Sequence, residues 1–204
     1  MNSLNPLLPS SSNESRESES TDVFSSLNRV LGLEAGGDVL HDALTGLPSL
    51  PLFNDRLTQA LMQAKRHSLR LAVMFIDLDG CKAIAETHGK HTGDQLMKLI
   101  GQRIISATRG EDTLSRRGDG FLFLMPEAAE ASNVAALASK LVDVVGKVCR
   151  VDGHQLAVKP SIGVAIFPDD GSSGHELLEK ARAAMEFALR EASGSMFWDK
   201  LDGS

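Results

Sequence analysis

Apolar residues recur along most of this chain at spacings that predict helices alternating with strands. They follow a helical period from residue 52 to 64, and Leu71–Ile76 is a continuous apolar run, typical of a strand buried on both faces. Helical periods return at residues 82–86 and 92–108. Apolar stretches then flank a Gly-Asp-Gly turn at residues 118–120, which predicts a β-hairpin.

The second half of the chain continues the alternation. A helical period covers residues 128–145, and two short apolar stretches, 148–151 and 155–159, flank an Asp-Gly turn that predicts a second hairpin. A last apolar strand is expected at 161–167 and a last helix at 175–192. The pattern therefore predicts an α/β (α+β) fold with a central mixed five-stranded sheet flanked by helices.

The N-terminal part has a different composition. Residues 1–21 are rich in Ser, Glu and Asn, cannot bury a core, and are predicted to be a disordered tail. Residues 22–40 are predicted to form an amphipathic helix and linker, either as a packing helix or as the seam of a dimer. Residues 41–200 are expected to form one compact domain, and residues 201–204 a short tail.

Charge and composition narrow the functional classes. The net charge of −6 argues against a general nucleic-acid or anionic-membrane binder. The sequence has neither an apolar run long enough to span a membrane nor a secretory leader, so we expect a cytoplasmic protein. Cys81 and Cys149 are far apart in the sequence and are expected to be free thiols.

Two carboxylates are the first candidates for chemistry. Asp77 ends the buried strand, and Asp119 lies at the tip of the hairpin. If that strand neighbours the hairpin, both carboxylates and a backbone carbonyl could hold Mg²⁺ against phosphates. The alternative is ordinary turn chemistry. His88 and His91 share a three-residue spacing, and surface histidines are the simpler interpretation than a metal site.

Several stretches together resemble a known family. They are Asp-Ala-Leu-Thr-Gly-Leu-Pro at 42–48, Phe-Ile-Asp-Leu-Asp-Gly-Cys-Lys at 75–82, His-Gly at 88–89, Gly-Asp at 93–94, Ser-Ile-Gly-Val-Ala at 161–165 and Pro-Asp-Asp-Gly at 168–171. Over residues 41–200 the chain resembles the GGDEF domain, typically a diguanylate cyclase. The resemblance implies a dimer that joins two GTP molecules into cyclic di-GMP with Mg²⁺ ions, one GTP on each half.

The family's functional residues match this chain unevenly. The resemblance implies metal binding by Asp77, the Leu78 carbonyl and Asp119, with Asp119 also a vestigial catalytic residue. It implies nucleotide binding by Asp94, which would hydrogen-bond guanine, and by Gly118 and Lys82.

Other positions depart from the family. Ala85 replaces an Asn that reads guanine, Lys90 replaces a His, and Arg182 and Leu189 replace an Asp and a phosphate-binding Lys. The signature hairpin reads Arg-Gly-Asp-Gly at 117–120, without its second carboxylate. Losing one charge-stabilising group typically costs about 10²–10³ in rate, so we expect weak or no cyclase activity.

One regulatory feature is retained. Arg109 and Asp112 resemble the family's RxxD inhibitory site, where an arginine and an aspartate bind cyclic di-GMP; the alternative is a solvent-facing pair at a helix end. The sequence therefore predicts a catalytically impaired GGDEF domain that binds cyclic di-GMP or GTP and engages a partner protein or a second copy in bacterial second-messenger signalling. An active cyclase and a nucleotide-independent scaffold remain the alternatives.

Overall fold

The computed structural model describes residues 40–202, so the predicted N-terminal tail and the helix at 22–33 lie outside the described residues. The helices are α2 (Leu50–His67), α3 (Cys81–His88), α4 (Lys90–Ala107), α5 (Ala131–Gly146), α6 (Gly174–Glu191) and α7 (Asp199–Asp202). The strands are β1 (Leu71–Asp79), β2 (Thr113–Arg117), β3 (Gly120–Met125), β4 (Cys149–Val151), β5 (His154–Leu156), β6 (Lys159–Phe167) and β7 (Ser195–Phe197).

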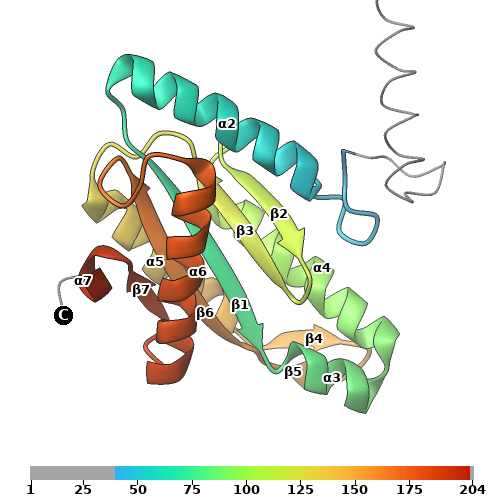
Figure 1. Cartoon of the computed structure of the whole chain (residues 1–204). Coiled ribbons are helices and arrows are strands. Elements are labelled where there is room, and N and C mark those ends of the chain that lie inside the picture. The colour runs from blue at the N-terminus through green and yellow to red at the C-terminus, as the bar shows by residue number, and fades with distance from the viewer. Residues whose placement is uncertain (1–39, 203–204) are drawn as a thin grey trace, which may run out of the picture. The chain divides into compact units, whose positions relative to one another are not determined.

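Five of these strands form one sheet in the order β2-β3-β1-β6-β7 (Figure 1). Neighbouring strands are antiparallel except β6 and β7, which are parallel. The mixed five-stranded sheet predicted from the sequence is thus confirmed.

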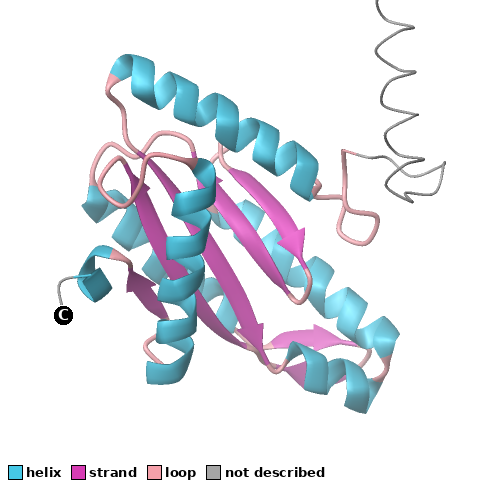
Figure 2. Cartoon of the chain, viewed as in Figure 1, coloured by secondary structure: helices cyan, strands magenta, loops and turns pink. Residues whose placement is uncertain are grey.

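The composition of the sheet differs from the sequence pattern in one respect. The predicted second hairpin exists, but β4 and β5 pair only with each other and form a separate two-stranded ribbon near α3 (Figure 2). The fifth strand of the main sheet is β7, which was not predicted because three residues are too few to show a period-2 pattern.

Helices cover both faces of the sheet. On one face, α2 and α6 pack over Leu71, Val73, Leu122 and Leu124; on the other, α4 and α5 pack over Met74, Ile76, Phe121 and Phe123 (Figure 1). The strands alternate between these faces, because successive side chains of a strand point to opposite sides. Both faces are apolar, as the continuous apolar runs of β1 and β3 predict.

Local hydrogen bonds explain two boundaries. Asp42 accepts hydrogen bonds from the backbone N and the Oγ1 of Thr45, at 2.8 and 2.6 Å, which closes the turn before α2. Ser49 then caps α2 by accepting from the backbone N of Leu52, with Pro51 in the first turn. The helix predicted from residue 128 begins three residues later, at Ala131.

The cysteines and the apolar character of the helices can be checked in the described residues. Cys81 and Cys149 are both buried and free, as predicted. No helix in the described part of the chain combines the length and apolar character needed to cross a lipid bilayer.

Candidate functional site

The pairing of β1 with β3 brings Asp77 and Asp119 to the same end of the sheet. Ile76 lies opposite Phe121 in the ladder, so Asp77 follows on one strand where Gly120 begins the other. Asp119 occupies the two-residue turn between β2 and β3, because Arg117 pairs with Gly120 across it. The first predicted strand therefore lies beside the hairpin, as the predicted Mg²⁺ site requires.

The electrostatics of this edge favour a cation. Burial raises the pKa of Asp77, and the negative charges of Asp79 and Asp119 raise it further. Burial followed by the charges of Asp119 and Asp77 raises the pKa of the Cys81 thiol to about 12, which keeps it protonated at neutral pH. Carboxylates that repel one another at short range are the usual setting of a divalent-cation site.

A backbone oxygen is also positioned at this edge. Leu78 stands opposite Pro160 in the β1–β6 ladder. Because proline has no backbone N–H, this cross-strand partner cannot donate to the Leu78 carbonyl. Two carboxylates and a backbone carbonyl are hard oxygen ligands, so the donor set fits Mg²⁺. No cluster of three His, Cys, Asp or Glu side chains that could hold a metal ion occurs among residues 40–202.

The close approach of β3 to β1 leaves no room for a carboxylate at position 120. Gly118 has φ +60°, a conformation that favours glycine. Gly120 is buried against β1, and a Cβ built on it would lie 2.3 Å from the Ile76 carbonyl oxygen. In this backbone, position 120 has no room for a side chain, so an acid there requires β1 and β3 to move apart.

The resemblance links positions 85 and 94 to guanine, and the residues at both positions have contacts within the protein. Asp94 does not present a free carboxylate, because its Oδ2 lies 2.6 Å from the Nζ of Lys90 one helical turn away. That hydrogen bond lowers the pKa of Asp94. Ala85 packs against Gly93, where an added Cβ would approach the Ala85 Cβ to 2.8 Å. Lys82 lies exposed in the first turn of α3.

Cations near the hairpin have partners within the protein. The Arg117 guanidinium lies 5.1 Å from the ring centroid of Phe75, stacked on the sheet. Arg182 lies between two carboxylates of its own helix, at 3.0 Å from Glu179 and 2.9 Å from Glu186. Leu189, which the resemblance aligns with a phosphate-binding lysine, carries no charge.

Arg109 and Asp112 lie at a second, separate site. Both residues line a cavity of about 490 Å³ between the end of α4, the loop before β2 and α5. The backbone N–H of Arg109 donates to Asp112 Oδ2 at 2.9 Å, which fixes the turn. The Arg109 side chain is exposed and has no ion-pair partner among residues 40–202.

The other oxygen of Asp112 has an unusual environment. Asp112 Oδ1 is buried and has no hydrogen-bond partner in the described structure. Burial raises the pKa of Asp112, although the hydrogen bond from Arg109 opposes this. A buried acceptor without a donor is costly, about 1–3 kcal/mol, so a hydrogen-bond donor that reached this oxygen would stabilise the protein.

Sequence reasoning did not find the α5 side of this cavity. Asn133 and Lys140 line it from α5, and Lys140 Nζ donates to the Ala107 carbonyl at 2.8 Å. Both residues lie more than twenty positions beyond Asp112, and no motif in the sequence joins them to it. Of the two histidines with a three-residue spacing, His88 has its ring centroid 4.4 Å from that of His154, with the two rings tilted by 45°.

The architecture described above, a mixed five-stranded sheet with helices on both faces, is that of solved GGDEF domains. The GGDEF domain of TpbB (YfiN) from Pseudomonas aeruginosa superposes with a TM-score of 0.73 at 31% identity, covering 75% of this chain and 97% of that one. The GGDEF domain of DgcB from Caulobacter crescentus, solved in complex with c-di-GMP, gives 0.72 at 25% identity over 81% of this chain and 96% of that one.

The family model described as "Diguanylate cyclase, GGDEF domain" matches residues 39–194, and the chain belongs to this family. The bifunctional diguanylate cyclase/cyclic di-GMP phosphodiesterase MucR of Pseudomonas aeruginosa is 43% identical over 149 residues, which is 73% of this chain. The chain spans only 22% of the length of MucR and 36% of the cyclase TpbB.

Proposed function

We propose that this GGDEF domain is catalytically impaired and acts as a cyclic di-GMP-binding module in second-messenger signalling. The observation that carries the proposal is the contrast between its two sites. The cavity at Arg109 and Asp112 is lined by an arginine whose side chain is exposed and by an aspartate with one buried oxygen that lacks a donor. At the hairpin, position 120 has no space for an acid, and Asp94 is paired with Lys90.

The chemistry of the cavity suits a guanine nucleotide. A guanidinium can donate to phosphate oxygens or to a guanine edge, and a carboxylate can accept from guanine N–H groups. The buried Asp112 Oδ1 lacks such a donor in the described structure. The complex of DgcB with c-di-GMP supports the choice of ligand. A cytoplasmic location and a dimer remain predictions from the sequence.

Substitution of Arg109 tests the proposal. Isothermal titration calorimetry with cyclic di-GMP is expected to show heat for the wild type and a roughly 10–100-fold weaker affinity for Arg109→Ala, because a hydrogen bond to a charged group contributes about 1.5–3 kcal/mol. Arg66→Ala, an exposed arginine on α2, is the matched control and should bind like the wild type. Absence of heat for the wild type would refute ligand binding.

We also propose that Asp77, Asp119 and the Leu78 carbonyl retain a weak Mg²⁺ site. The carboxylates repel one another, and the raised pKa of Asp77 means that its charge opposes folding at neutral pH. This penalty is largest above the folded-state pKa and disappears as the pH falls below the unfolded-state pKa. A divalent cation would remove it without a change of pH.

Asp77→Asn is therefore expected to raise the melting temperature at pH 7 without metal, with a gain that shrinks as the pH is lowered toward 4. Millimolar Mg²⁺ should stabilise the wild type and leave Asp77→Asn unchanged. Differential scanning fluorimetry across pH, with the exposed Asp143→Asn as control, gives both readouts. An equal Mg²⁺ response in the two proteins would place the metal elsewhere.

A further inference from the structure

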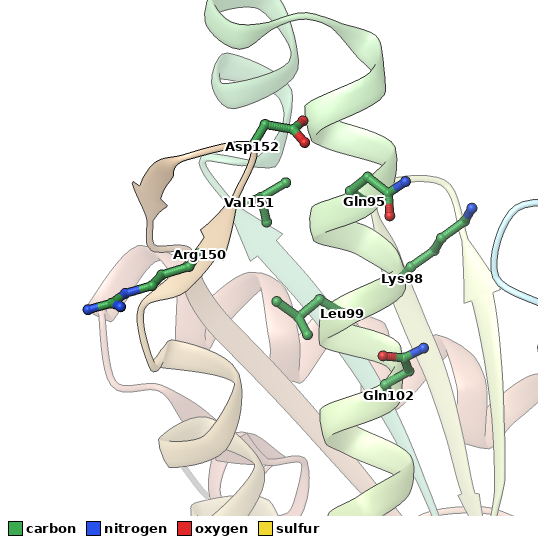
Figure 3. Close-up of a pocket in the computed structure, with 7 residues that line it drawn as sticks. All are labelled: Gln95, Lys98, Leu99, Gln102, Arg150, Val151 and Asp152. Carbon is green, nitrogen blue, oxygen red and sulfur yellow. The ribbon is translucent and has the colours of Figure 1, made fainter.

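A groove follows the exposed side of α4, away from the carboxylates of the hairpin. It consists of two adjoining hollows, of about 320 and 470 Å³, and both include Leu99 and Gln102. We call it the α4 groove: residues 95–107 of α4 facing residues 140–147 of α5 and 150–152 of the β4–β5 ribbon. Figure 3 shows its end at β4, where Leu99 and Val151 point into the space between the two elements.

The α4 groove is basic in an acidic protein. Five cations line it: Lys98, Arg103, Lys140, Lys147 and Arg150. Its lining carboxylate, Asp152, already accepts a hydrogen bond from Thr92 Oγ1 at 2.9 Å. The whole chain carries a net charge of −6, so this local positive excess is opposite in sign to the average surface. Such a patch attracts negatively charged partners.

Two of these cations have a structural role, and three remain available. Arg103 donates to the carbonyls of Lys147 and Val148, at 2.6 and 2.9 Å, and so satisfies the end of α5. Lys140 does the same for the Ala107 carbonyl at the end of α4. Lys98, Lys147 and Arg150 make no side-chain hydrogen bond or ion pair within residues 40–202. In Figure 3, Lys98 and Arg150 extend outward from opposite sides of the hollow.

The floor of the α4 groove is apolar. Leu99, Val144 and Val151 line it from three different elements. Ile105 and Val148 adjoin lining residues in the sequence and leave 51% and 54% of their surface exposed. An apolar strip with cations along its edges matches a segment that has one apolar face and acidic residues on both sides of it.

We propose that the α4 groove docks an acidic amphipathic helix of a partner protein. Residues 95–107 of α4 span about 18 Å, which corresponds to roughly three turns of a partner helix lying along them. The proposal rests on the proposed function only in taking this domain to be a signalling module that has a partner protein. Lys98, Lys147 and Arg150 do not line the cavity of Arg109 and Asp112. The α4 groove adjoins that cavity and shares Ser106, Ala107 and Lys140 with it. Substitutions at Lys98 and Lys147, which line only the groove, therefore test partner binding apart from cyclic di-GMP binding.

A designed peptide tests the proposal. The probe is a fluorescein-labelled helical peptide of about 14 residues, with Leu at every third or fourth position and Glu elsewhere, titrated with the full chain in an anisotropy assay. We expect saturable binding that weakens about tenfold in Lys98→Glu/Lys147→Glu, and severalfold when salt is raised from about 50 to about 300 mM. Lys65→Glu/Arg66→Glu on α2 makes the same change in charge on another face and should bind the probe like the wild type.

Three results would overturn the proposal. The first is equal binding of the Glu/Leu probe and of a matched Lys/Leu or Glu/Ser peptide. The second is tighter binding of a short single-stranded RNA, which would make the ligand a nucleic acid. The third is a dimer in light scattering that Lys98→Glu/Lys147→Glu dissociates, which would make the occupant a second copy. Unchanged cyclic di-GMP calorimetry in that variant, within about twofold, shows that the protein is folded and its other site intact.

Discussion

Gly120→Glu, which restores the second acid of the family signature, is expected to destabilise the protein and to give no diguanylate cyclase activity. The Cβ of any residue at position 120 would lie 2.3 Å from the Ile76 carbonyl oxygen, and the obstacle is backbone that cannot rotate away. We expect a loss of roughly 3 kcal/mol in the free energy of unfolding, at the upper end of overpacking effects, and a melting temperature lower by about 6–12 °C.

Gly110→Glu is the matched control for stability. It makes the same substitution in the loop after α4, where nothing lies within 4 Å of an added Cβ, so its melting temperature should stay close to that of the wild type. Incubation with GTP and Mg²⁺ followed by chromatography gives the functional readout, and neither the wild type nor Gly120→Glu is expected to form cyclic di-GMP. Turnover by the wild type, abolished in Asp77→Ala, would establish an active cyclase instead.

The expectation of no activity rests on several altered groups, each of which has a partner within the protein. Lys90, where the resemblance has a histidine, pairs with Asp94, the carboxylate that the resemblance assigns to guanine. Arg182 is held between Glu179 and Glu186, and Arg117 is stacked on Phe75. Restoring one group leaves the other substitutions in place, so a single reversion is not expected to restore activity.

The sequence predicted those parts of the fold that depend on long periodic segments. The buried strand at Leu71–Ile76, the hairpin at 118–120 and the helices around them are all confirmed. Strand β7 could not be predicted, because three residues carry no period and the strand exists only through its pairing with Ile162–Val164. The start of α5 shifted to Ala131, within the usual uncertainty of helix ends.

The candidate sites divide in the same way. The approach of Asp77 to the hairpin followed from an apolar strand that ends in a carboxylate, and the structure brings the two together. The Lys90–Asp94 ion pair can be predicted from the sequence, because the two residues are four positions apart on a helix. The positions of Asn133 and Lys140 at the Arg109 cavity cannot be predicted in this way, because tertiary packing alone brings α5 to that cavity.

The periodicity of apolar residues does not predict where two backbones come into close contact. Gly163 marks the closest such contact among the described glycines. It interrupts the apolar strand β6 beneath α6, where an added Cβ would lie 1.9 Å from the Ala181 carbonyl oxygen and 2.1 Å from the Met185 nitrogen. A glycine inside a strand often marks such a close approach. Because α6 also bears Glu179 and Arg182, this contact sets the distance of those residues from the sheet.

Gly163→Ala is accordingly expected to be among the most damaging single substitutions in the domain. One methyl group would force the backbone of α6 away from β6 and open the core beneath Leu177 and Ala181, so we expect a loss of about 4 kcal/mol or more in urea-induced unfolding. Gly101→Ala is the control: its Cβ would make ordinary contacts of 3.5 Å or longer, and alanine in a helix should add about 0.5–1 kcal/mol. The free energy of unfolding of Gly163→Ala could instead lie within about 1 kcal/mol of the wild-type value. In that case α6 does not lie against β6 at this distance, and the placement of Arg182 and Glu179 relative to the sheet is wrong as well.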